Sequence, residues 1–219
     1  MPDEATIRWA ETDADIDAAY ALFRRRIGVA LVEDEASFRI SVSCESADWI
    51  PRLGLAEVDG RPVAAQLGGL LPAVRLLSLP YTAVAEAFEG RGIYRMLKLA
   101  MIERLRHDAR AHALPEPEGN VAEEPVGSAQ YRRKVGGGIA VVLPVAYRSP
   151  AAQGLRETPL ALTYEPLTAV AAPIDPVAIR DIVAAIYRGI YRIAAPEQDP
   201  TFRRVVATLA GAPGGLSGA

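Results

Sequence analysis

The stretch "YTAVAEAFEGRGIYRMLKLAMIERL", residues 81–105, is the part of the sequence that decides the fold. It begins as an apolar segment rich in residues that favour strands, passes through two glycines that flank an arginine, and continues as an amphipathic helix. Packing seldom requires bare backbone where a strand becomes a helix. Binding an anion there often does, because small residues let the anion reach exposed amide groups. One face of the helix carries apolar residues spaced four apart, namely Ile93, Leu97, Met101 and Leu105.

The bulk properties predict a globular protein with no membrane span. Of the 219 residues 50% are hydrophobic and 23% are charged, which is the balance of a chain that can bury a core. A net charge of −3 argues against a nucleic-acid partner, which would select a basic face. The apolar runs are far shorter than the roughly 20 residues that a membrane helix needs. The acidic N-terminal segment has no signal-peptide pattern, so we expect a cytoplasmic protein.

Cysteine and histidine are too scarce to suggest a disulfide or a metal site. Cys44 is the single cysteine, and His107 and His112 are the only histidines. We therefore expect no metal ion. Cys44 follows Val42 in the alternating stretch "SFRISVSC", which fits either a strand or a transition from helix to strand. This position predicts a buried cysteine that acts as a small hydrophobic residue.

The N-terminal half contains further signals for a mixed fold. A strand-like piece at residues 6–9 precedes a helical pattern that Asp13 or Asp15 would cap. The apolar residues of that helix are Ile16, Tyr20, Phe23 and Ile27. Two β-rich runs flank Asp59-Gly60, a dipeptide typical of a tight hairpin turn.

The C-terminal half alternates short strands and helices. Residues 114–126 read as a loop around a short strand, and "GSAQYRRKVGGG" as one or two helical turns ending at the glycines. Asp175 and Pro176 begin a last helix, whose apolar stripe must pack on its own domain or across a dimer interface. The fold class is therefore α+β (α/β), with a mixed, mostly antiparallel sheet flanked by helices. We expect a domain over residues 1–168, a helical extension over 169–210 and a flexible tail over 211–219.

The two glycines of the opening stretch leave helix amide groups accessible. Gly90 and Gly92 lack the side chains that would keep a phosphate away, and the helix dipole adds partial positive charge. Arg91 and Arg95 add cationic charge. The segment lacks the lysine of a P-loop and the third glycine of a dinucleotide fingerprint. By itself the pattern also fits a plain connection between a strand and a helix.

With its flanks included, the stretch resembles the GNAT family of acyl-CoA-dependent N-acyltransferases. In that family a strand leads to (Arg/Gln)-x-x-Gly-x-(Gly/Ala), and the next helix N-terminus holds the pyrophosphate of acetyl-CoA. Here "YTAVAEAFEGRGIYRML" matches the strand, the spacing and the glycines, and "AQYRRKVGG" resembles a later family segment, Tyr-x-(Arg/Lys)-x-x-Gly. Glu89 and Tyr94 depart from the usual residues. The resemblance covers about residues 5–165, and the last helix resembles an extension of some bacterial members.

The resemblance implies direct transfer of an acetyl group from acetyl-CoA to an amine. The pantetheine arm would form hydrogen bonds with the backbone of Thr82, Ala83 and Val84. The pyrophosphate would be surrounded by Gly90, Arg91, Gly92, Ile93, Tyr94 and Arg95, and Asn120 would contact the coenzyme.

The resemblance also suggests catalytic residues. Tyr131 would protonate the leaving thiolate, and Glu116, close to Glu118, would take a proton from the amine. A core or interface tyrosine and a solvated loop carboxylate are the simpler interpretations of these residues. The acceptor would be a small-molecule or peptide amine, and a homodimer is compatible with the sequence. The alternative function is a non-catalytic acyl-CoA-binding or interaction module with a degenerate site; a purely structural protein is a third interpretation.

Overall fold

The structure, a computed structural model, describes residues 5–167 and 174–211 and contains a seven-stranded sheet flanked by helices. The strand order is β1-β2-β3-β4-β5-β9-β6, and β7 and β8 form a separate two-stranded sheet. Only β4 and β5 pair in parallel within the large sheet. The predicted fold class is confirmed.

The elements have the following bounds. The strands are β1 (Thr6–Trp9), β2 (Ile50–Val58), β3 (Arg61–Leu71), β4 (Leu76–Val84), β5 (Gly119–Glu124), β6 (Val141–Val142), β7 (Arg148–Ser149), β8 (Thr158–Pro159) and β9 (Ala161–Pro166). The α-helices are α1 (Asp13–Arg26), α2 (Glu35–Ser43), α3 (Ile93–Ala111), α4 (Ala129–Gly136), α5 (Pro176–Gly189) and α6 (Pro200–Ala207). Short 3₁₀ helices are η1 (Pro72–Val74), η2 (Glu86–Phe88), η3 (Pro196–Gln198) and η4 (Thr208–Gly211).

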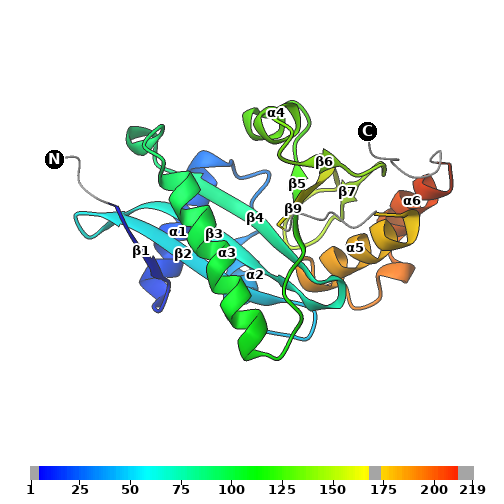
Figure 1. Ribbon diagram of the computed structural model, residues 1–219, viewed down its shortest axis with the longest axis horizontal. Helices are drawn as coiled ribbons and strands as arrows, with labels where there is room; N and C mark the ends of the chain where they lie inside the picture. Colours follow the sequence, from blue (N-terminus) through cyan, green and yellow to red (C-terminus); the bar gives the residue numbers. More distant parts are fainter. Residues whose placement is uncertain (1–4, 168–173, 212–219) are drawn as a thin grey trace.

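Helices cover both faces of the sheet. The long helix α3 crosses one face, and α1 and α2 lie behind the strands in Figure 1. The predicted stripe of α3 is confirmed, since Leu97, Met101 and Leu105 are fully buried against β2, β3 and β4. On the other face, Phe23 of α1 and Phe38 of α2 pack with Tyr81 of β4. Burying both faces of the central strands fixes β4, and therefore the glycine turn that follows it.

The hairpin between β2 and β3 turns at the predicted dipeptide. Asp59 and Gly60 both have positive φ, of 52° and 71°. A two-residue turn with both φ values positive matches the twist of the flanking strands, which explains the Asp-Gly sequence.

The N-cap of helix α1 is neither Asp13 nor Asp15, the two predicted caps, but the residue before Asp13. Thr12 is the N-cap: its hydroxyl accepts from the Asp15 amide, while the Asp15 carboxylate accepts from the Thr12 amide. Asp15 therefore closes a capping box rather than capping the helix itself. The Arg8 guanidinium also donates to Asp15 and holds the pKa of that carboxyl well below its usual range.

We expect Thr12→Ala to lower the free energy of unfolding by about 1 kcal/mol, because it removes the acceptor for one helix amide. Thr12→Ser keeps the hydroxyl and serves as the control. Chemical denaturation of the three proteins measures the difference. Equal stability of the alanine variant and the wild type would show that the cap does not contribute.

The stretch around Cys44 was predicted with the wrong environment. Residues 35–43 form helix α2, capped by Asp34, so the open choice between a strand and a helix-to-strand transition is resolved as a helix. The buried residues Phe38 and Ser41 follow helical rather than strand periodicity. Cys44 lies just beyond the helix and is exposed, so the prediction of a buried cysteine was wrong.

The C-terminal helices pack on the same molecule. Asp175 caps α5 and Pro176 is its first residue, as predicted. The stripe of α5, including Ile179, Val183 and Ile186, is buried in a cluster with strand residues such as Leu162. This places α5 and α6 beside β5 and β9 at one end of the sheet (Figure 1).

Some sequence predictions fall outside the described residues. The expected boundary between residues 168 and 169, and nearly all of the tail over 211–219, lie there. No helix within residues 5–167 and 174–211 is long and apolar enough to cross a bilayer. Within the same ranges no group of three or more His, Cys, Asp or Glu side chains could hold a metal ion.

Candidate functional site

The N-terminus of α3 has no side-chain cap. Gly92 is the N-cap residue, at φ 80°, and Gly90 also has a positive φ of 74°. By contrast, the other five α-helices that the structure describes each begin with a side chain that accepts from a first-turn amide. The first turn of α3 therefore presents backbone N–H groups without the usual acceptor, in a region of partial positive charge.

The strands next to this turn separate from each other. β4 pairs with β5 only from Leu76 to Ser78, against residues 119–121. Beyond that point β4 continues to pair with β3, and β5 with β9. The register of β3 and β4 also shifts between the pairs at Tyr81 and Ser78, where Pro80 lies. Within the described part of the chain, the second half of β4 therefore has one edge without a strand partner.

A cavity of about 530 Å³ lies at the glycine turn; we call it the turn cavity. Its charged lining residues are three arginines and one glutamate, which favours an anionic ligand. Burial raises the pKa of the Tyr94 hydroxyl to about 12, with Glu165 and Glu124 adding to the shift. The lining residues are Arg26, Thr82, Ala83, Val84, Phe88, Glu89, Gly90, Gly92, Ile93, Tyr94, Arg95, Ala129, Gln130 and Arg133.

A second cavity, of about 470 Å³, occupies the space where β4 and β5 separate; we call it the strand-gap cavity. Leu79 to Thr82 of β4 and Ala122 to Glu124 of β5 line it. Its other walls include the end of α1 and the residues after it, the segment from Pro125 to Gln130, the β7–β8 hairpin, and the residues that follow α5. The two cavities share Arg26, Thr82 and Gln130, so they meet at Thr82, near the C-terminal end of β4.

A carboxyl group lies deep in the strand-gap cavity. The hydroxyls of Tyr147 and Tyr191 both donate to Oε1 of Glu123, at 2.6 and 2.8 Å. Burial raises the pKa of Glu123 above its ordinary value, and the two tyrosine hydrogen bonds offset part of that effect. Burial likewise raises the pKa of both tyrosines, so they stay protonated as donors. Glu123 retains some accessible surface and lines the cavity, so it can exchange a proton with a ligand there.

The other carboxylates beside the two cavities are neutralised. Glu89, one of the two departures from the GNAT pattern, pairs with Arg26 of α1. Arg26 therefore compensates the negative charge of Glu89, so this carboxylate would not repel an anion at the glycine turn as an unpaired one would. Glu124 accepts from Lys134 at 2.5 Å and from Gln130 at 3.3 Å. The buried ion pair between Lys134 and Glu124 joins α4 to β5. The hydrogen bond from Gln130 to Glu124 holds Gln130 at the point where the cavities meet.

The structure brings most of the predicted coenzyme-binding residues together. Eight of them line the turn cavity, namely Thr82, Ala83, Val84, Gly90, Gly92, Ile93, Tyr94 and Arg95. Arg91 is not among the lining residues; its guanidinium stacks over the Phe88 ring, 4.9 Å from the centroid. Asn120 is buried within β5 and its Oδ1 has no hydrogen-bond partner among the described residues.

The structure does not bring the two predicted catalytic residues to the cavities. Tyr131 is half-buried on α4 and lines neither cavity, although Gln130 and Arg133 on the same helix do. Glu116 is exposed and pairs with Arg110 at the C-terminal end of α3. The glycine turn is at the other end of this 19-residue helix, about 28 Å away.

Sequence reasoning missed Glu123. The stretch "GNVAEE" did signal a short strand, but nothing in it marks one glutamate as buried. Its two tyrosine partners are 24 and 68 residues away in the sequence. Arg26 was missed for the same reason, because only the packing of α1 on β4 carries it to the cavities.

The chain has the fold of solved GNAT acetyltransferases. It is similar to the ribosomal-protein-S18-alanine N-acetyltransferase from Escherichia coli, with 16% identity, a TM-score of 0.55, and coverage of 77% of this chain and 97% of that one. It is also similar to a phosphinothricin acetyltransferase from Sinorhizobium meliloti in complex with AcCoA, with 16% identity, a TM-score of 0.53, and coverage of 76% and 92%. A third similar structure is the NatC complex bound to Gag peptide and CoA, with 12% identity, a TM-score of 0.53, and coverage of 75% and 99%. No protein-family model and no curated protein matches the chain.

Proposed function

We propose that the protein is an acyl-CoA-dependent N-acyltransferase that moves an acetyl group from acetyl-CoA directly to an amine. One observation carries the proposal: the uncapped start of α3 opens into a cavity with excess positive charge, which meets a second cavity containing Glu123. Acyl transfer needs this combination of a site for the donor and a joined site for the acceptor.

The chain supplies groups suited to each part of acetyl-CoA. The amides of the first turn of α3, with Arg95 and Arg133, would bind the pyrophosphate. The open edge of β4 offers the backbone of residues 82–84 to the pantetheine arm. Acetyl-CoA supplies an activated acyl group as a thioester. The reacting carbonyl would lie near Thr82, because that residue lines both cavities.

Glu123 is our choice for the general base. An ammonium has no lone pair, so the acceptor must lose a proton before it attacks the thioester carbonyl. Glu123 would take that proton through its free oxygen, since both tyrosines bond to Oε1. The new C–N bond then forms as the C–S bond breaks. A carboxyl group with a raised pKa is better matched to this task than an exposed one.

Tyr131 was predicted to protonate the departing sulfur, and its position makes a test possible. Because its ring lines neither cavity, we expect Tyr131→Phe to lower kcat by less than about threefold, below the effect typical of a general acid. Steady-state kinetics with saturating acetyl-CoA measures this. A loss of about 100-fold or more would return Tyr131 to the catalytic role.

The acceptor is an amine of a small molecule or a peptide. Two similar structures are named for protein or peptide ligands, and a third for a small-molecule substrate, so the fold accommodates both. We also infer a cytoplasmic protein that acts without nucleic acid or metal, with a homodimer as a further expectation. These expectations rest on the sequence.

Thiol release tests the proposal. The wild-type protein is mixed with acetyl-CoA and a panel of primary amines, and free coenzyme A is followed over time. We expect amine-dependent release that stops when the amine is exhausted. Binding of acetyl-CoA without release for any amine would favour the alternative, a non-catalytic acyl-CoA-binding module.

A further inference from the structure

Four charged residues line the strand-gap cavity, and two of them are already paired. These are Arg26, which pairs with Glu86 and Glu89, and Glu124, which pairs with Lys134. Pairing within the protein satisfies these groups, so a ligand gains little by contacting them.

The other two charged residues have no ion-pair partner among the described parts of the chain. Glu123 receives hydrogen bonds from neutral tyrosine hydroxyls only. Arg156 lies at the exposed side of the cavity, in the loop between β7 and β8, with no carboxylate within 4.0 Å in the described ranges. The cavity therefore has an uncompensated carboxyl group deep inside and an uncompensated guanidinium at its rim.

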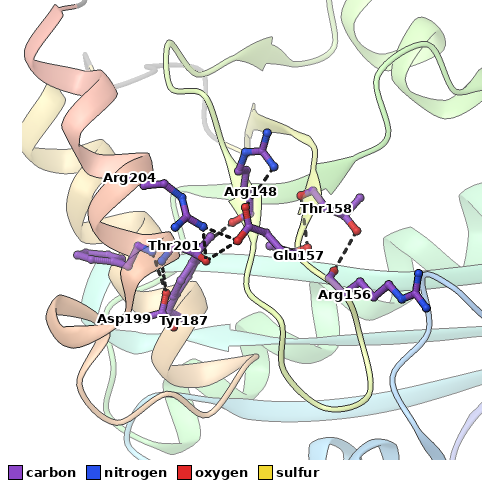
Figure 2. A network of polar contacts seen from close by, with 10 residues as sticks. Arg148, Arg156, Glu157, Thr158, Tyr187, Asp199, Thr201 and Arg204 are labelled. Atoms are coloured by element: carbon purple, nitrogen blue, oxygen red, sulfur yellow. Dashed lines mark hydrogen bonds and ion pairs between the residues drawn. The ribbon is translucent and has the colours of Figure 1, made fainter.

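The direction of Arg156 supports this assignment. Figure 2 shows a polar network in which Arg148 and Arg204 both pair with Glu157. Arg156, the immediate neighbour of Glu157, extends away from this network. Arg148 of β7 and Arg204 of α6 therefore fix the loop through Glu157, whereas Arg156 lines the strand-gap cavity.

Apolar side chains line the same cavity as the two charged groups. The apolar lining residues include four leucines and one isoleucine, namely Leu31, Leu79, Leu155, Leu160 and Ile190. A ligand with charges only at its ends would match this arrangement, because its middle would bury apolar surface.

We propose that the acceptor is a small amine that also carries an anionic group, with its amine directed to Glu123, its anion to Arg156 and an apolar spacer between them. This inference rests on the proposed function, since it names the substrate class of the same site. Carboxylate and phosphate groups share the required chemistry at the Arg156 end.

Matched pairs of linear ligands test the proposal. We would use 4-aminobutanoate, 6-aminohexanoate and 8-aminooctanoate, each beside the alkylamine of equal length, in calorimetric titrations without acetyl-CoA. At the best length the amino acid is expected to bind about fivefold more tightly than the alkylamine, as for an exposed ion pair. Arg156→Gln should remove that difference in affinity. In turnover assays the same variant should raise KM for the amino acid and leave kcat unchanged. Arg148→Gln, in the adjoining strand β7 and outside the lining of this cavity, is the matched control, and it should keep the preference.

The outcomes separate the inference from the proposed function. Equal affinity of the two ligand series, or tighter binding of the peptide amide Ala-Ala-Ala-NH₂, would overturn the inference and leave acetyl transfer intact. A preference that Arg148→Gln removes and Arg156→Gln keeps would also overturn it. Failure of acetyl-CoA to bind would instead contradict the proposed function, while the calorimetric comparison of amines would still decide the inference.

Discussion

Replacing Gly92 with glutamate is expected to weaken acetyl-CoA binding by more than about 100-fold. Gly92 caps α3, lines the turn cavity and has a positive φ of 80°. A carboxylate about 4 Å from a phosphate, in a medium of effective dielectric constant near 20, costs about 4 kcal/mol. Calorimetric titration of the variant with acetyl-CoA measures the change.

Gly60→Glu provides the control for backbone strain. Gly60 lies in the hairpin between β2 and β3 and also has a positive φ, of 71°. At both glycines the space that a Cβ would occupy is open, with no atom beyond the adjoining residues within 4 Å. Both substitutions therefore strain the backbone by about 1–2 kcal/mol, with no steric clash in either case. Only Gly92→Glu should lose acetyl-CoA. Equal binding by both variants would show that the turn of α3 does not hold the pyrophosphate.

Glu123→Gln is expected to lower kcat by about 10²- to 10⁴-fold, the usual contribution of a general base. Glutamine still accepts hydrogen bonds from Tyr147 and Tyr191 through its carbonyl oxygen, so the geometry of the cluster is retained. Steady-state kinetics against pH is the measurement. The wild type should gain activity as pH rises through the raised pKa of Glu123, and the variant should lack this step.

The contribution of Glu123 to stability should fall as pH rises, whereas the activity should increase. The folded-state pKa of Glu123 lies above its ordinary value of 4.5, so the protonated group stabilises the fold. That contribution is complete below pH 4.5 and is lost as pH rises through the folded-state pKa. Above this point the carboxylate is the disfavoured form, so Glu123→Gln should unfold at an equal or higher temperature than the wild type. A variant that is both inactive and much less stable would indicate a structural role.

Glu116→Gln distinguishes the two candidate bases. Glu116 pairs with Arg110 in solvent, far from both cavities, and we expect its amide variant to retain wild-type kcat. If instead Glu116→Gln loses activity and Glu123→Gln keeps it, the assignment from the structure is wrong and the resemblance-based assignment is right.

Local patterns predicted the fold well. The stripe of α3, the Asp59-Gly60 hairpin and the Asp175 cap each depend on residues close together in the sequence, and all are confirmed. The prediction of a buried Cys44 was wrong because a short apolar alternation fits a helix and a strand equally well. Only the packing of this segment against α1 decides which of the two forms.

The two cavities of the site also differ in how far the sequence alone could predict their lining residues. The turn cavity is formed largely by one continuous segment, which is why eight residues named from the sequence line it. The strand-gap cavity combines β4, β5, the β7–β8 loop and the residues after α5. No local pattern could place Glu123 beside Tyr191, since their contact depends on how α5 packs at the end of the sheet.

The most direct test of the central claim is a pair of calorimetric titrations of the wild-type protein, one with acetyl-CoA and one with S-acetylpantetheine. Both ligands contain the thioester, but only acetyl-CoA contains the pyrophosphate. If the bare backbone of Gly90 and Gly92 serves to bind that group, acetyl-CoA should bind at least about 100-fold more tightly. Equal affinity for the two ligands, or no binding of acetyl-CoA, would contradict the account.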